Sequence, residues 1–183
     1  TWSELIGQDA IVKRIDTIRQ RFSGLGGKAY WLTGASGTGK STAARLIADE
    51  VAQCEFSVSE LDASDLTADF LRDYDRRVVG KPLGGNGWAF IANEAHLLSR
   101  AQIGKLLTVI EPPGGLRPYV VWCFTTTNSG EEKLFADCDD AGPLLSRCIQ
   151  LPLSRRDLAK PFAIRAQQIA QAEGLDGRPL EAY

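Results

Sequence analysis

The segment Ala29-Tyr30-Trp31-Leu32-Thr33-Gly34-Ala35-Ser36-Gly37-Thr38-Gly39-Lys40-Ser41-Thr42 sets the architecture that the rest of the chain must accommodate. It consists of an apolar run, then Gly-x-x-x-x-Gly-Lys-Ser, then apolar residues at helical spacing. This order predicts a strand over 29–33, a phosphate-binding loop, and a helix that runs to about Gln53. A glycine-rich turn that matches by chance is the alternative, and the flanking strand and helix patterns argue against it.

The residue types in the loop suit a nucleoside triphosphate and Mg²⁺. Glycines let consecutive backbone N–H groups turn toward phosphate oxygens. Lys40 can reach the β- and γ-phosphates, and the Ser41 hydroxyl can ligate Mg²⁺ at the start of the helix. We therefore predict that ATP and Mg²⁺ are held by the loop residues Gly34, Ala35, Ser36, Gly37, Thr38, Gly39, Lys40, Ser41 and Thr42.

The composition is that of an ordinary globular protein. The 183 residues are 44% hydrophobic and 24% charged, and the formal net charge is −2. This charge does not indicate global attraction to nucleic acid or to an anionic membrane, and a local basic patch stays open. No apolar run approaches about 20 residues and the N-terminus lacks a signal-peptide layout. We therefore expect a cytoplasmic protein without membrane contact. Its four widely spaced cysteines favour reduced thiols over a zinc site.

Strands and helices are expected to alternate along the chain. Four further strands are predicted from short apolar runs over 56–61, 88–92, 119–124 and 148–153. Helices are predicted over 8–22, over 63–79 with Ala63-Ser64-Asp65 as its cap, over 99–111 before Pro112-Pro113, and over 143–147. This alternation predicts an α/β domain, with a five-stranded parallel sheet flanked by helices and ligand chemistry at the carboxyl ends of the strands.

A domain boundary is expected near residue 153. Residues 1–153 form the predicted nucleotide-binding domain. The sequence Ser154-Arg155-Arg156-Asp157 is a predicted capping box that opens a helix to about Glu173, which Gly174 ends. Residues 154–183 are thus predicted to begin a second, helical domain.

The third predicted strand ends on Asn93-Glu94, downstream of the phosphate loop. In P-loop ATPases an acidic residue at the first position helps to hold Mg²⁺, and a following glutamate polarises the attacking water. Glu94 can act as that base. Asn93 can coordinate Mg²⁺ weakly through its amide oxygen, but it brings no negative charge, so we expect lower metal affinity. The alternative is that Glu94 is only a surface residue at a strand end.

Other candidate residues carry weaker signals. The run Thr125-Thr126-Thr127-Asn128 follows the fourth strand and could hydrogen-bond a γ-phosphate or the attacking water, although threonine also suits a strand structurally. Arg147 lies between a short helix and a strand, where it is either an ordinary surface arginine or a donor to a transferring phosphoryl group. His96 has no second histidine beside it and is expected to be structural.

Several segments together resemble the AAA+ ATPases, and within them the clamp-loader subunits of DNA replication. Trp2-Ser3-Glu4-Leu5-Ile6-Gly7-Gln8 resembles the N-terminal box of the family, and Leu61-Asp62-Ala63-Ser64-Asp65 resembles a segment of replication factor C small subunits. The segment 91–99 and the segment 106–113 are similar to the bacterial gamma subunit, as is Leu145-Ser146-Arg147-Cys148. These matches follow the expected order from about Trp2 to Leu153.

The resemblance implies specific roles. Ile6 in the N-terminal box would lie beside adenine, Glu94 would be the catalytic glutamate, and Thr127 or Asn128 would be the sensor 1 residue. Arg147 would be an arginine finger that reaches the ATP of a neighbouring subunit, and the helix after Ser154 would start the lid domain. The implied partners are other AAA+ subunits, in a homo- or hetero-oligomer, together with DNA and a DNA-bound protein.

Two functions follow as alternatives. The first is ATP hydrolysis that drives assembly or remodelling on DNA in replication, recombination or repair. The second, favoured by Asn93, is a nucleotide-binding but hydrolysis-poor regulatory subunit of a larger complex. A small P-loop kinase is a weaker third possibility, because nothing in the sequence resembles an acceptor site.

Overall fold

Five parallel strands form the centre of the molecule. The computed structural model describes residues 1–2, 5–111, 115–156, 158–175 and 179, and within them the strand order is β2-β3-β4-β1-β5. Every neighbouring pair is parallel. The strands are β1 (Lys28–Thr33), β2 (Val58–Asp62), β3 (Trp88–Asn93), β4 (Val120–Thr126) and β5 (Ile149–Pro152). The predicted five-stranded parallel sheet is confirmed.

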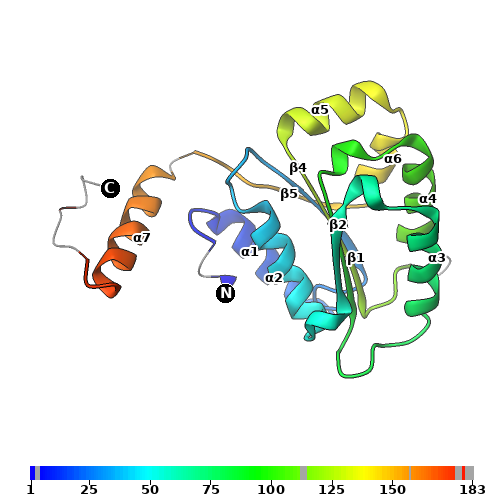
Figure 1. Cartoon of the computed structure of the whole chain (residues 1–183), viewed down its shortest axis with the longest axis horizontal. Helices are drawn as coiled ribbons and strands as arrows, with labels where there is room; N and C mark the ends of the chain where they lie inside the picture. The colour runs from blue at the N-terminus through cyan, green and yellow to red at the C-terminus, as the bar shows by residue number, and fades with distance from the viewer. Residues whose placement is uncertain (3–4, 112–114, 157, 176–178, 180–183) are drawn as a thin grey trace.

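Helices cover both faces of the sheet (Figure 1). One face is packed by α1 (Asp9–Arg19) and α2 (Lys40–Ala52). The other is packed by α3 (Ala68–Arg77), α4 (Arg100–Ile110), α5 (Asn128–Asp137) and α6 (Ala141–Ser146). Because both faces are covered, all residues of the central strand β4 are buried, which explains its nearly continuous apolar sequence.

Stacked aromatic rings fill the core beneath α3 and α4. The Trp122 ring lies between Phe90 and Phe124, with centroid distances of 4.9 and 5.7 Å. Tyr74 of α3 meets the ring of Phe90 edge-on at 4.9 Å. Such pairs add to the free energy gained by burying apolar area, so this cluster anchors α3 to β3 and β4.

The predicted starts of the second strand and of the helix that follows it are wrong. The second strand begins only at Val58, because Glu55–Ser57 form the 3₁₀ turn η2 and Phe56 is 87% exposed. The segment Ala63–Asp65 forms another 3₁₀ turn, η3, and does not cap the next helix. The cap of α3 is Thr67, whose extended backbone lets its side chain accept a hydrogen bond from the Phe70 N–H. By contrast, the capping box of α4 at Ser99 and Gln102 is confirmed.

Helix α5 was not predicted, and Thr127 provides its N-cap by accepting a hydrogen bond from the Gly130 N–H. Its sequence is mostly polar, and Gly130 and Leu134 are its buried residues. Apolar periodicity therefore gives almost no signal for it.

Helix α7 (Ala159–Ala172) stands apart from the sheet, and none of its described residues is buried (Figure 1). It begins later than predicted, because the Ser154 hydroxyl accepts a hydrogen bond from the Arg156 N–H in a turn. Arg155 and Arg156 thus precede the helix, while Asp157, like Pro112 and Pro113, lies outside the described residues. The predicted end is confirmed: Gly174 has φ 67°.

The cysteines are unpaired, and three of the four are buried. Across the described ranges, no helix has the length and apolar character that crossing a membrane requires.

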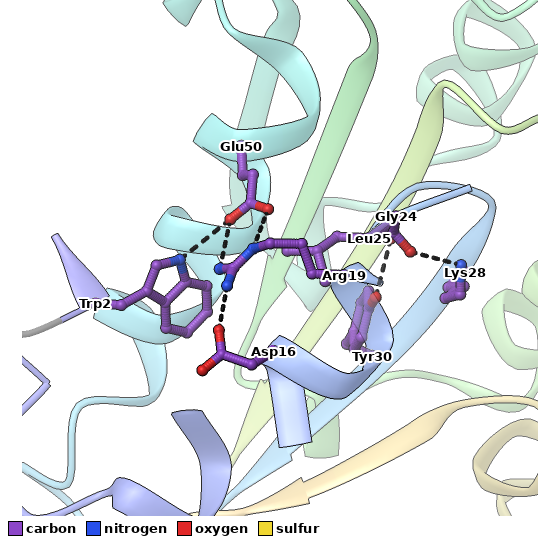
Figure 2. Close-up of polar contacts among 8 residues, drawn as sticks. All are labelled: Trp2, Asp16, Arg19, Gly24, Leu25, Lys28, Tyr30 and Glu50. Atoms are coloured by element: carbon purple, nitrogen blue, oxygen red, sulfur yellow. Dashed lines mark hydrogen bonds and ion pairs between the residues drawn. The ribbon is translucent and has the colours of Figure 1, made fainter. Parts of the chain in front are cut away.

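A polar cluster joins the N-terminal segment to α1 and α2 (Figure 2). Arg19 of α1 donates two hydrogen bonds to the carboxylate of Glu50 on α2, at 2.6 and 2.9 Å, and is also paired with Asp16. The indole N–H of Trp2 donates to Glu50 at 3.2 Å. The Arg19 bonds hold the pKa of Glu50 below its ordinary value. This cluster fixes the start of the chain against the domain.

We predict that the stacked core is a main source of stability. Phe90→Ala should lower the free energy of unfolding by about 3–5 kcal/mol, because it leaves a cavity between Tyr74 and Trp122. Phe56→Ala is a matched control at an exposed site and should change it by less than about 0.5 kcal/mol. Urea unfolding monitored by circular dichroism measures both, and equal losses would contradict the prediction.

Candidate nucleotide-binding site

The phosphate loop connects β1 to α2 at the carboxyl edge of the sheet. Gly37 and Gly39 have φ of 78° and 92°, and Gly39 is the N-cap of α2. A Cβ built on Gly34 would lie 2.7 Å from the carbonyl oxygen of Leu153, so only glycine fits there. Ser36 and Gly37 are exposed at the tip of the loop. The loop is therefore open to an anion in front of the N-terminus of α2.

Lys40 folds back over this loop. Its Nζ donates to the carbonyl oxygens of Gly34 and Ala35, at 3.0 Å each. Burial lowers the pKa of Lys40, and the negative charge of Glu94 opposes that shift. The two residues come from different strand ends, since Lys40 follows β1 and Glu94 follows β3. A phosphate group would offer the ammonium a stronger acceptor than either carbonyl.

Asn93 is held by neighbours on two adjoining strands. Its amide NH₂ donates to Glu60 of β2 at 2.9 Å, and its amide oxygen accepts from the Thr125 hydroxyl of β4 at 2.9 Å. Glu60 in turn pairs with Arg45 of α2 through two hydrogen bonds, at 2.8 and 3.0 Å. Since a carboxylate needs a donor, Glu60 sets the orientation of the Asn93 amide. The second lone pair of the amide oxygen stays available to a metal or to a metal-bound water.

Glu94 has a left-handed backbone, with φ 51° and ψ 47°. This conformation costs a non-glycine residue about 1–2 kcal/mol. The Oε2 atom of Glu94 lies 3.3 Å from Nδ1 of His96. His96 belongs to the 3₁₀ turn η4 (Ala95–Leu97). Local backbone strain of this kind clusters at functional sites.

The threonine run after β4 has its side chains engaged within the domain. Thr125 donates to Asn93, Thr126 is fully buried beside His96, and Thr127 caps α5. Asn128 is the exposed first residue of α5. The run therefore joins the ends of β3 and β4 to α5, and its sensor role remains a prediction.

Arg147 caps the C-terminus of α6. Its guanidinium pairs with Glu111, beyond the end of α4, and donates to the carbonyl oxygen of Pro143 at 3.0 Å. Neither partner belongs to the phosphate loop. The role of Arg147 as an arginine finger stays a prediction.

Ile6 lines a cavity of about 530 Å³ between the N-terminal segment, α1 and α7, together with Trp2, Val12 and Ile164. The cavity adjoins the phosphate loop through Leu5: a Cβ on Gly39 would lie 2.9 Å from Cδ1 of Leu5. Its apolar residues suit the flat face of a base, and Asp9, Arg165 and Gln168 add polar groups to the lining. Ser3 and Glu4 of the N-terminal box lie outside the described residues.

Gln8 is a site residue that the sequence analysis missed. It is only 3% exposed, and its amide accepts from the Ser154 N–H at 3.1 Å and donates to the Ser154 carbonyl at 2.7 Å. The same NH₂ lies 3.5 Å from the carbonyl oxygen of Thr38. One side chain thus joins the N-terminal segment, the phosphate loop and the linker to α7. The sequence signal that could have identified Gln8 is a polar residue placed between Gly7 and the first helix.

The donor set fits Mg²⁺ that is bound together with a nucleotide. The described residues contain no group of three or more histidine, cysteine, aspartate or glutamate side chains that could hold a metal ion. Ser41 is exposed in the first turn of α2, and Asn93 offers one oxygen lone pair. Mg²⁺ is commonly held by few protein ligands, with phosphate oxygens and waters completing the octahedron.

Comparisons with known proteins agree with this geometry. The model of the family described as "ATPase family associated with various cellular activities (AAA)" matches residues 30–134. This span includes the phosphate loop, Asn93, Glu94 and the threonine run. No curated protein matches the chain by sequence.

Solved structures share the fold. A RuvB variant of Thermotoga maritima is 20% identical with a TM-score of 0.68, over 95% of this chain and 54% of that one. Another RuvB variant is 23% identical with a TM-score of 0.66, over 93% and 55%. A DNA polymerase III gamma subunit-related protein of T. maritima is 12% identical with a TM-score of 0.56, over 90% and 53%. The chain thus spans about half the length of these proteins.

The family match covers more than half of the chain, and it coincides with the phosphate loop and the strand ends described above. The chain therefore belongs to the AAA family of ATPases.

Proposed function

We propose that the protein binds Mg·ATP at the phosphate loop and hydrolyses it with Glu94 as the general base. The observation that carries the proposal is the shared position of the phosphate loop after β1 and of Glu94 after β3, because parallel strands bring both to the carboxyl edge of the sheet. Mg²⁺, held by Ser41 and Asn93, would neutralise charge on the β- and γ-phosphates. Ile6 and the cavity beside it would receive the base.

Each proposed group has one task in hydrolysis. Backbone N–H groups of the loop bind the phosphates, and Lys40 exchanges its carbonyl contacts for phosphate oxygens. Glu94 accepts a proton from water as the water oxygen bonds to the γ-phosphorus. The bond between that phosphorus and the bridging oxygen breaks, which yields ADP and inorganic phosphate.

We further propose that the protein works in an assembly of AAA+ subunits on DNA, as a clamp-loader-type ATPase in replication, recombination or repair. The DNA polymerase III gamma subunit-related protein and RuvB among the fold neighbours support this class of role. Thr127 or Asn128 would sense the γ-phosphate, and Arg147 would reach the ATP of the next subunit.

A hydrolysis-poor regulatory subunit is the second candidate function. The specific observation in its favour is the neutral Asn93, whose amide is already shared between Glu60 and Thr125. Mg²⁺ prefers carboxylate ligands, so this arrangement favours binding over rapid turnover.

The first prediction separates binding from hydrolysis. Lys40→Met should abolish measurable ATP binding, because it removes the phosphate-binding cation. Glu94→Gln should keep ATP affinity and lower turnover by about 100-fold or more, because the base is lost. Calorimetry and phosphate release measure the two effects, with the exposed Lys105→Met as control. Equal ATP turnover in the wild type and Glu94→Gln would contradict the proposed mechanism.

A second prediction concerns Arg147. Arg147→Ala should lower turnover without weakening ATP binding, because the arginine serves a neighbouring site. Mixing this variant with Glu94→Gln should restore activity, since intact Glu94 sites then receive an intact arginine. Arg100→Ala, which breaks another exposed ion pair, should leave turnover unchanged. Failure of the mixture to recover activity would exclude action between subunits.

A third prediction tests the Asn93 network. Asn93→Asp alone would set a carboxylate beside that of Glu60, so it should not strengthen Mg²⁺-dependent ATP binding. Asn93→Asp combined with Glu60→Gln keeps one donor in the pair and should raise Mg²⁺ affinity by about tenfold. Calorimetric titration of Mg²⁺ into the ATP complex measures this. A full gain from Asn93→Asp alone would show that Glu60 does not constrain position 93.

A further inference from the structure

We propose that His96 is a positioning residue that holds the carboxylate of Glu94 through its Nδ1–H. The inference rests on the proposed role of Glu94 as the base and adds a residue that acts through Glu94. It is supported by the contacts of His96 with Glu94 and Thr126, and by the packing of the His96 ring against Gly130.

The contacts converge on one ring nitrogen. Nδ1 of His96 lies 3.3 Å from Oε2 of Glu94 and 3.2 Å from the hydroxyl oxygen of Thr126. The Thr126 hydroxyl donates to the carbonyl oxygen of Thr127 at 3.4 Å, so its oxygen is left to accept. Nδ1 therefore carries the proton, and this N–H faces both oxygens. The contact needs only a neutral imidazole.

Packing leaves the ring little freedom. Thr126 is fully buried, and the side chain of His96 is 21% exposed. The ring also meets the first turn of α5, where a Cβ built on Gly130 would lie 2.7 Å from Nδ1, 2.8 Å from Cγ and 2.9 Å from the Thr126 hydroxyl oxygen. Glycine at position 130 thus leaves the space that the ring occupies.

The exposure of Glu94 gives such support a purpose. This left-handed residue follows the end of β3, and the carboxylate is half exposed, so packing alone does not fix it. A hydrogen bond to Oε2 restricts its rotation and leaves Oε1 to accept the proton of water. Small misplacements of a catalytic group cost large factors in rate.

Asparagine and glutamine test this role, because both carry a side-chain amide but place it at different distances from the backbone. The amide nitrogen of asparagine can occupy the place of Nδ1, whereas that of glutamine corresponds to Nε2. We expect His96→Gln and His96→Leu to lower turnover by about 10-fold to 100-fold with unchanged ATP affinity. His96→Asn should retain most of the activity. Gly130→Ala, whose Cβ would press on both the ring and the Thr126 hydroxyl that contacts it, should behave like His96→Gln.

The outcomes that overturn the proposal are distinct. Equal turnover in the wild type and His96→Leu would show that Glu94 needs no such support. Equal losses in His96→Asn and His96→Gln would indicate a merely structural ring. Loss of ATP affinity in parallel with turnover would point to collapse of the site.

A spectroscopic readout is independent of hydrolysis, because His96 is the only histidine in the chain. Nitrogen-15 NMR of the wild type should show the neutral tautomer protonated at Nδ1, and Glu94→Gln should shift that signal. A tautomer protonated at Nε2 would overturn the inference. If the wild type holds the Nδ1 tautomer but lacks ATPase activity, the proposed function fails while the contact stands.

Discussion

Parallel pairing of β1, β4 and β3 is the constraint on which the site depends. Because these strands lie side by side and run in one direction, the residues that follow them emerge at a single edge of the sheet. The phosphate loop follows β1, the threonine run follows β4, and Asn93 with Glu94 follow β3. Residues about 30 to 90 positions apart thus reach the same edge. The aromatic core of Phe90, Trp122 and Phe124 maintains this alignment from below.

The chemistry at this edge is carried by polar side chains that hold one another. Arg45, Glu60, Asn93 and Thr125 form a chain of contacts across α2, β2, β3 and β4. At the proposed Mg²⁺ site, such a network places a neutral amide in the position of a carboxylate ligand. It explains why a single change at position 93 is not equivalent to restoring an acidic ligand: the change also alters the surroundings of Glu60.

Sequence patterns predicted the strands well and some helix starts badly. Apolar runs such as 119–124 are unambiguous, because a strand covered on both faces must be apolar throughout. Helix α5 was not predicted, because its largely exposed sequence has almost no apolar periodicity. The cap at Thr67 was missed because Ala63-Ser64-Asp65 offers similar capping chemistry four residues earlier, and only the path of the chain after β2 decides between them.

The sequence by itself determined the phosphate loop, the parallel sheet and the candidate roles of Lys40, Ser41 and Glu94, because these follow from local spacing of glycine, charge and apolar residues. Only the tertiary structure revealed the partners of these residues. Gln8 reaches a linker 146 residues away, Glu60 orients Asn93, and His96 lies beside both Glu94 and the first turn of α5. Such contacts depend on the order of strands in the sheet and on where loops turn, and no local pattern encodes either.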